Sequence, residues 1–548
     1  MTASLGEAPS GDELLARILN DESPVGPASA DELDRGIAKA LYDTKTEINK
    51  TMRATSPVFL IGRRGSGKTA VLKGTFPEGQ LDVTLDAAVL LRDVGMTLDI
   101  LGLPISSSYT DLTTPVWRAV FVAALCAKVH SHYCRLSKAE CPEAFNFGRL
   151  PYISESGPGT DAASRFLGRI RESASLLDGA HVARFLDSIE INGTPLWIAR
   201  QELERAARAA HCQAVVSIDS LDRYETFLYS GGFQVSRDAQ ALQALFRTAS
   251  QTGRAADSIY KVRVSFPAEL WHYYSDLSSN PLKDFDNSII LHWSGSELLE
   301  LVARRFLNYL RLHHPNEYRK IPGNLQRPSA RAGWAQELFN RYLPGTVTNA
   351  LGGRESIIAY ILRHTQLLPR HMIHVVNAVL RNREFREGVS IRSGEVQIAV
   401  NDAADLISNT VLDAYSLPYP ELKEVCEAVI PTLPLRFSAG ELHTQMNRTP
   451  WGKDFLEVLR MLVEVGVVGR VVEEGELYLK ADFEYLHHSR MYMVEDDELC
   501  LHPVFASRFD CQATKQPEKE SNRKPIYPYG SDLELDVART GVHVRDAD

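Results

Sequence analysis

The sequence predicts an α/β protein in which the first part of the chain forms a mainly parallel sheet. Two patterns predict this fold class, and the composition indicates a chain that can fold around large cores. Short apolar segments typical of strands alternate with segments of helical periodicity between residues 56 and 292. Hydrophobic residues make up 44% and charged residues 24% of the 548 residues, as in proteins that bury large cores. A glycine-rich turn separates the first apolar segment from the helix that follows it.

The N-terminal residues 1–31 are rich in Gly, Pro, Ser, Asp and Glu, so we expect a flexible leader with at most one short helix, at 12–19. Asp31 can cap a helix that continues to Met52. The apolar run 56–61 then predicts a short buried strand that leads into the glycine-rich turn.

Further strands and helices are predicted along the chain. Strands are expected at 81–91, 214–218, 260–266 and 288–292, and helices near Trp117, at 195–210 and at 237–250. Strands separated by helices favour a parallel sheet that is covered on both faces. The pattern is helical only from 296 to about 410, and from 417 to 509 it changes to three helices followed by strands.

A complete phosphate-loop motif follows the first predicted strand. It matches GxxxxGK[ST] and consists of Gly62, Arg63, Arg64, Gly65, Ser66, Gly67, Lys68 and Thr69. Glycines let successive backbone N–H groups face phosphate oxygens, and the start of the next helix adds its positive dipole. Lys68 is suited to reach the β- and γ-phosphates, and Thr69 to ligate Mg²⁺. Because no guanine-reading NKxD string occurs, ATP with Mg²⁺ is the expected ligand.

A phosphate loop also needs an acid at the end of a neighbouring strand to hold the magnesium. Asp219 follows the apolar strand 214–218 and is the expected magnesium partner. Asp222 is a candidate for orienting or deprotonating the attacking water, and a helix cap is its alternative role. Together these residues predict a magnesium-dependent nucleotide site.

The loop Gly62 to Thr69, the long interval before the second strand and the string 219–223 (DSLDR) resemble STAND-type signalling NTPases and KAP P-loop ATPases, which are relatives of the AAA+ ATPases. The resemblance covers about residues 50–295 with its motifs and the rest of the chain only by domain order, and it implies a P-loop NTPase core. Arg223 stands where the STAND pattern usually has an acid, and Ser220 stands where the KAP pattern has Asp. Similar bacterial ATPases act as regulators or in defence against phage, so the resemblance implies an ATP-binding and ATP-hydrolysing switch protein.

The resemblance also suggests roles for two residues outside the loop. Ser265, at the end of the predicted strand 260–266, is a candidate for sensing the γ-phosphate, and a merely buried serine is the alternative. Arg370 follows Pro369 and resembles the sensor-2 arginine of AAA+ and origin-recognition-type ATPases. A guanidinium suits that role because it stays charged and binds phosphate oxygens two at a time. The alternative is a surface arginine after a helix-starting proline.

The expected domain order is a flexible leader (1–31), a P-loop ATPase core (32–295), a helical lid (296–410), a winged-helix-like domain (411–510) and a flexible tail (511–548). No apolar run is long enough to span a membrane, and the N-terminal residues lack the pattern of a secretory signal. The seven cysteines include no CxxC pair, which fits reduced thiols. We therefore expect a cytoplasmic protein without membrane contact.

The distribution of charge suggests partners. Between Leu417 and Phe509, nine Lys or Arg stand against sixteen Asp or Glu, so this module should repel phosphate and favour a protein partner. The lid is locally basic through Arg304, Arg305, Arg311, Arg319, Lys320, Arg327, Arg331, Arg381, Arg383 and Arg386. A solvated basic face is one interpretation, and a surface for nucleic acid or an acidic partner is the other. A homo-oligomer is also considered, although no arginine occurs from Val264 to Ala303, where AAA+ rings place an arginine finger.

Two functions from other classes stay open beside the ATP-hydrolysing switch. One is an ATP-dependent DNA-binding protein of the origin-recognition type, in which the lid and the winged helix clamp a duplex. The other is a scaffold that binds ATP without hydrolysing it. The acidic C-terminal module disfavours DNA, whereas Arg223 in the place of an acid keeps the scaffold open.

Overall fold

The chain forms two compact units in this computed structural model. The first unit contains the described residues of Met1–Thr46, Arg64–Ala70 and His292–Asp548, and the second contains those of Glu47–Arg63 and Val71–Leu291. The structure describes residues 11–30, 33, 37, 41, 58–74, 82–100, 109–133, 160–174, 201, 214–221, 237–254, 260–271, 280–326, 333–385, 391–416, 418–448, 454–486, 490–494, 496–511 and 524–531.

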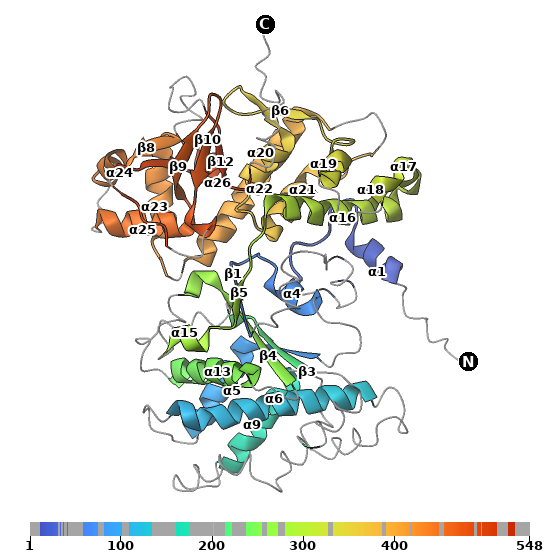
Figure 1. Ribbon diagram of the computed structural model, residues 1–548, viewed down its shortest axis with the longest axis vertical. Helices are drawn as coiled ribbons and strands as arrows, with labels where there is room; N and C mark the ends of the chain where they lie inside the picture. The colour runs from blue at the N-terminus through green and yellow to red at the C-terminus, as the bar shows by residue number, and fades with distance from the viewer. Residues whose placement is uncertain are drawn as a thin grey trace. The chain divides into compact units, whose positions relative to one another are not determined.

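A five-stranded sheet forms the centre of the second unit (Figure 1). Its strands are β1 (Phe59–Gly62), β2 (Asp82–Asp86), β3 (Ala214–Asp219), β4 (Tyr260–Pro267) and β5 (Ser288–Ile290), in the order β2-β3-β4-β1-β5. Every pair of neighbouring strands is parallel. All six residues of β3 are buried, so both faces of this strand are covered. The predicted α/β class and parallel sheet are confirmed.

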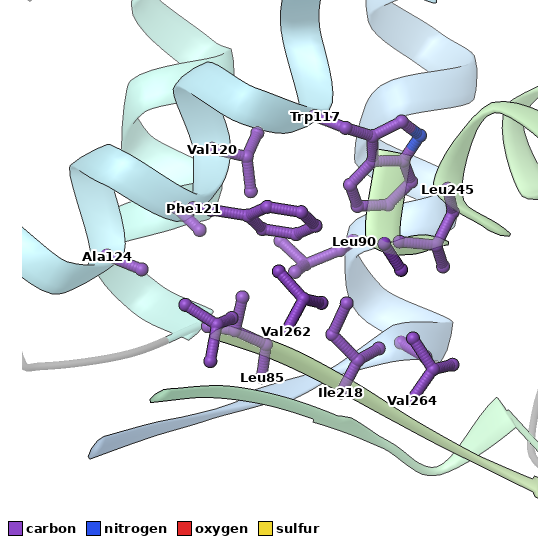
Figure 2. Close-up of a cluster of buried hydrophobic side chains, with 14 of the residues drawn as sticks. Leu85, Leu90, Trp117, Val120, Phe121, Ala124, Ile218, Leu245, Val262 and Val264 are labelled. Carbon is purple, nitrogen blue, oxygen red and sulfur yellow. The ribbon is translucent and has the colours of Figure 1, made fainter. Parts of the chain in front are cut away.

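Helices alternate with these strands, and several of them pack on one face of the sheet. They are α4 (Lys68–Gly74), α5 (Ala87–Ile100), α6 (Tyr109–Tyr133), α9 (Thr160–Ala174), α13 (Arg237–Arg254) and α15 (Pro281–Asp284). Figure 2 shows Trp117 and Phe121 of α6 and Leu90 of α5 directed toward Leu85 and Ile218 of the sheet. Among the helices that the structure describes, none has the length and apolar character to cross a membrane.

Several of the predicted elements in this unit have different bounds, and three helices were missed. The predicted strand 81–91 ends at Asp86, because the residues that follow bury a helical rather than an alternating set of apolar positions in α5. The helix near Trp117 begins at Tyr109 and accommodates Pro115 in its first turns. Helices α5, α9 and α15 were not predicted, and apart from residue 201 the predicted helix 195–210 lies outside the described residues.

The lid region of the first unit is mostly helical. Its helices are α16 (Gly295–His313), α17 (Pro315–Lys320), α18 (Gly323–Gln326), α19 (Trp334–Phe339), α20 (Ile357–Arg363), α21 (Pro369–Leu380) and α22 (Ser393–Ala414). The prediction of helices alone is wrong at one place, where β6 (Thr346–Thr348) and β7 (Arg354–Ser356) form an antiparallel hairpin. Gly352 closes the turn between these strands with a φ of +79°, a value that glycine adopts without strain.

The leader is packed against the lid, so the prediction of a flexible leader is wrong for residues 11–30. Helix α1 (Gly11–Ile18) buries Leu15, and Val25 is fully buried. The side chain of Asn377 on α21 accepts a hydrogen bond from the Val25 N–H at 2.9 Å. Arg305 of α16 donates to the Val25 carbonyl at 3.2 Å. The polar composition of residues 11–30 predicted flexibility, but a few buried apolar residues and hydrogen bonds from lid side chains hold this segment in place.

The C-terminal part of the first unit combines helices with a second five-stranded sheet (Figure 1). Its elements are α23 (Leu422–Val429), β8 (Arg436–Ser438), α24 (Ala439–Met446), α25 (Phe455–Val465), β9 (Val468–Glu474), β10 (Leu479–Asp482), β11 (Glu498–Leu501), α26 (Pro503–Arg508) and β12 (Ile526–Pro528). The sheet order is β12-β10-β9-β11-β8. The predicted succession of three helices and then strands is present, with β8 and α26 added to it.

Two expectations about domain boundaries change here. The expected boundary between residues 410 and 411 falls inside α22, and the lid and the C-terminal elements belong to one unit. The prediction of a flexible tail from 511 onward is wrong at β12, which pairs in parallel with β10. Its Tyr527 is fully buried and donates a hydrogen bond to Glu355. The sequence could not reveal this strand, because its partners lie far away along the chain.

Candidate functional site

The predicted phosphate loop connects the end of β1 with the start of α4, as its motif requires. Gly65 and Gly67 have φ values of +86° and +89°, which only glycine adopts at little cost. The loop segment Arg64–Ala70 groups with the first unit, whereas the preceding strand belongs to the second. The physical basis for this grouping is the packing of the loop on residues of the lid.

The first turn of α21 lies directly against this loop. The backbone N–H of Arg370 donates a hydrogen bond to the carbonyl of Gly65 at 3.2 Å. A Cβ atom on Gly65 would lie 2.9 Å from the Cβ of Arg370, so only glycine fits here. Among the described residues, the partly exposed Arg370 guanidinium has no hydrogen-bond or ion-pair partner. The structure thus brings a cationic side chain of the lid beside the loop.

Burial and nearby charge act on His374, one helical turn after Arg370. Burial lowers the pKa of His374, and the positive charge of Arg370 lowers it further. The imidazole is therefore neutral near pH 7, and Arg370 supplies the positive charge of this part of α21.

A second side chain of the first unit contacts the loop, and sequence reasoning missed it. The indole N–H of Trp293 donates to the carbonyl of Ser66 at 2.8 Å, and this hydrogen bond is buried. Pro369 and Trp293 also come within 4.0 Å of the position that a Cβ on Gly67 would take. No sequence signal pointed to the contact, because Trp293 is far from the loop along the chain and belongs to no motif.

In the second unit, the structure brings Asp219 and Ser265 together. Asp219 is the last residue of β3, and the Ser265 hydroxyl donates a hydrogen bond to its carboxylate from the adjacent strand β4. Both side chains are buried. The next residue, Ser220, has a φ of +67°, which is uncommon outside glycine. Asp222 and Arg223 lie outside the described residues.

The strand order explains why chemistry can be expected at this edge of the sheet. Strand β4 lies between β1 and β3, so the carboxyl ends of the loop strand and the Asp219 strand are two strand spacings apart, roughly 10 Å. After β1 the chain continues to β2 at one edge of the sheet, and after β4 it continues to β5 at the opposite edge. A change of direction of this kind opens a crevice at the carboxyl ends of parallel strands, where ligands bind in many α/β proteins.

No group of three or more His, Cys, Asp or Glu side chains among the described residues could hold a metal ion without further ligands. Magnesium commonly binds through one or two carboxylates together with phosphate oxygens and water. Asp219 is a single buried carboxylate at the end of β3, which suits that mode.

Several basic side chains of the lid are already used within the first unit. Arg304, Arg311, Lys320 and Arg383 form ion pairs with Glu300, Asp12, Glu317 and Glu395. Arg305 is buried, donates to three backbone carbonyls, and has its pKa lowered by burial to about 10. Arg327, Arg331 and Arg386 lie outside the described residues. The described lid therefore offers less positive charge to a nucleic acid than its composition suggests.

The acidic residues of the C-terminal module are partly neutralised in the same way. Arg436 pairs with Glu474 and Glu498, and Lys524 also pairs with Glu474. Further ion pairs join Lys480 to Glu473 and Arg470 to Asp482 and Asp497. These ion pairs connect strands of the second sheet. The module therefore presents less negative charge to a partner than its composition suggests.

Comparison with known proteins does not assign the chain to a family. No model of a known protein family matches it, and no curated protein matches it either. The loop, the strand order and the side chains around them are therefore the features that bear on function.

Proposed function

We propose that the chain binds ATP with Mg²⁺ at the loop Gly62–Thr69, hydrolyses it, and acts as a nucleotide-controlled switch. The complete phosphate-loop motif at the carboxyl end of a parallel strand carries this proposal. Lys68 would contact the β- and γ-phosphates, Thr69 and Asp219 would hold Mg²⁺, and Asp222 would orient the attacking water. In this scheme Ser265 fixes the Asp219 carboxylate through its hydrogen bond.

The contact between the loop and α21 supports the switch part of the proposal. Arg370 belongs to the lid and touches the loop through its backbone, and its guanidinium has no partner among the described residues. A γ-phosphate would give this cation a partner in the ATP state that the ADP state lacks. A ligand shifts a conformational equilibrium by its differential contacts with the two states, and this contact would be one of them.

The resemblance to STAND and KAP ATPases extends the proposal to the other regions. The order of α23, α24 and α25 followed by β9 and β10 supports a winged-helix-like domain after the lid. The described cysteines Cys126, Cys426, Cys500 and Cys511 are buried thiols, which suits the reducing cytoplasm where ATP is abundant. The internal ion pairs of the lid make a protein partner a better proposal than DNA.

The test is ATP binding and turnover by the purified full chain with Mg²⁺, with and without duplex DNA. Lys68→Ala should abolish ATP binding, because it removes the cation that faces the phosphates. Lys73→Ala is the matched control, since Lys73 lies in the same helix but outside the motif. ATP affinity in Lys68→Ala equal to that of the wild type would refute the proposed site.

The same assay separates the alternatives. Turnover without DNA supports the switch, and turnover that requires DNA would favour the origin-recognition type. Tight binding without turnover would favour the ATP-locked scaffold.

A further inference from the structure

Two carbonyl groups of the phosphate loop are held by donors from the lid. The N–H of Arg370 binds the carbonyl of Gly65, and the indole N–H of Trp293 binds the carbonyl of Ser66. The described chain contains no cis peptide bond. In a trans peptide the carbonyl and the following N–H point in opposite directions. The N–H groups of Ser66 and Gly67 are therefore turned away from the lid donors.

Trp293 is itself fixed by its neighbours along the chain. On its N-terminal side, the Leu291 N–H donates to the carbonyl of Ile61 at 2.8 Å. On its C-terminal side, Ser294 caps α16 through a reciprocal pair of hydrogen bonds with Glu297. The Trp293 side chain is only 6% exposed. Its indole N–H is therefore a rigid donor for the loop and not a mobile surface group.

Ser66 provides a second observation that points to a ligand. The residue is fully buried, and its hydroxyl has no hydrogen-bond partner among the described residues. Buried hydroxyl groups usually form hydrogen bonds, so a buried hydroxyl without one points to a bound group that would supply the partner. The oxygen of a bound phosphate would give the Ser66 hydroxyl the hydrogen-bond acceptor that it lacks.

We propose that Trp293 is a positioning residue for phosphate binding. By holding the Ser66 carbonyl, it orients the Gly67 N–H toward the inside of the loop, where the β-phosphate of ADP or ATP would accept its hydrogen bond. The inference rests on the proposed nucleotide binding and adds a residue outside the loop motif. It predicts that Trp293 affects the affinity for both nucleotides equally, because the β-phosphate is common to them.

The experiment compares Trp293→Phe with Trp334→Phe in the full chain. The first substitution removes the donor to Ser66 and keeps an aromatic ring. Trp334 is also buried in the same unit, but its indole N–H has no hydrogen-bond partner among the described residues, so Trp334→Phe is the matched control. Dissociation constants for ADP and ATP are measured by calorimetry, and thermal unfolding is recorded for each variant.

Trp293→Phe should weaken ADP and ATP binding by the same factor, about fivefold, which corresponds to one neutral hydrogen bond. Trp334→Phe should retain the wild-type affinities. Addition of ADP should change the tryptophan emission of the wild type and of Trp334→Phe but not that of Trp293→Phe. If Trp293→Phe does not fold, Trp293→Tyr replaces it, and the emission change in Trp334→Phe is still required.

The outcomes distinguish this inference from the proposed function. Nucleotide affinity in Trp293→Phe equal to that in Trp334→Phe overturns the positioning role while nucleotide binding stands. Absence of an ADP-induced emission change in Trp334→Phe, in a protein that binds ADP, also overturns it. Failure of the wild type to bind any nucleotide overturns the proposed function and this inference together.

Discussion

The backbone N–H of Arg370 donates to the carbonyl of Gly65, and the aliphatic part of the Arg370 side chain packs across the same glycine. This contact joins a helix of the lid to the middle of the phosphate loop within one compact unit. Because the hydrogen bond uses the backbone alone, the guanidinium stays available for another partner. Loop and lid can therefore be tested separately by substitution.

Arg370→Ala should bind ADP almost normally and lose a closure that is specific to ATP, since the Cβ and the backbone contact are retained. Hydrogen exchange across residues 355–380 with ADP and with a non-hydrolysable ATP analogue measures this difference. In the wild type, ATP should protect the start of α21 more than ADP does. Identical protection of the wild type in both nucleotide states would show that the lid does not respond to the γ-phosphate.

Gly65→Ala should lower nucleotide affinity and stability by more than the strain of its positive φ alone would cause. An alanine at this position costs about 1–2 kcal/mol for the left-handed backbone and also contacts Arg370 at 2.9 Å. Gly333→Ala is the matched control, because Gly333 has a φ of +82° but no atom within 4 Å of the position that the added methyl group would take. Nucleotide affinity and melting temperature should fall further in Gly65→Ala. Equal losses in both variants would mean that the contact with Arg370 does not restrict the loop.

Asp219→Ala and Asp222→Asn should act on different steps. Loss of Asp219 should weaken the magnesium-dependent part of ATP binding, whereas loss of Asp222 should leave ATP bound and slow its hydrolysis by on the order of 10²-fold. Calorimetry with and without Mg²⁺ and single-turnover hydrolysis measure the two effects. Wild-type turnover in Asp222→Asn would remove Asp222 from the catalytic residues.

The buried carboxylate of Glu355 should make the tail strand important for stability. Arg363 binds it through two hydrogen bonds of 2.9 Å, and the Tyr527 hydroxyl binds it as well. Burial holds the pKa of Tyr527 well above its ordinary value, so the phenol keeps the proton that it donates. Tyr527→Phe should lower the free energy of unfolding by about 1–3 kcal/mol in urea titrations. Tyr529→Phe, at an exposed position of the same segment, should have no effect.

Stability should also fall at mildly acidic pH because of His364. Burial holds the pKa of His364 well below its ordinary value, and the positive charge of Arg363 lowers it further. The folded protein therefore keeps this imidazole neutral. The unfolded chain takes up the proton near pH 6.5, which favours unfolding as the pH falls from there toward the folded pKa. The contribution is at most about 1.4 kcal/mol per pH unit.

Urea unfolding between pH 7.5 and 5.5 measures this slope. His364→Gln should show a smaller slope than the wild type, even though it loses the hydrogen bond to the Tyr360 carbonyl. His443→Gln, at an exposed helix position, serves as the control. An unchanged slope in His364→Gln would assign the acid sensitivity to other groups.

The sequence by itself determined the parallel sheet and the turn at Gly62–Thr69 between a strand and a helix. Both depend on patterns that span only a few residues. The sheet follows from apolar runs such as those of β3 and β4, and the turn follows from the spacing of Gly62, Gly67 and Lys68. The pairing of β3 with β4 was also predictable, because successive strands of such sheets usually lie side by side. For these elements local propensity and tertiary structure agree.

Only the tertiary structure decided which residues remote along the chain lie beside the loop and in the interior of the first unit. The hydrogen bond from Trp293 to Ser66, the contact of Arg370 with Gly65 and the burial of Tyr527 beside Glu355 join residues that are remote along the chain. No periodicity or motif encodes such pairs, since they arise when separate surfaces pack together. The leader and the tail were misjudged for the same reason, because polar composition does not reveal the few side chains that the rest of the fold holds in place.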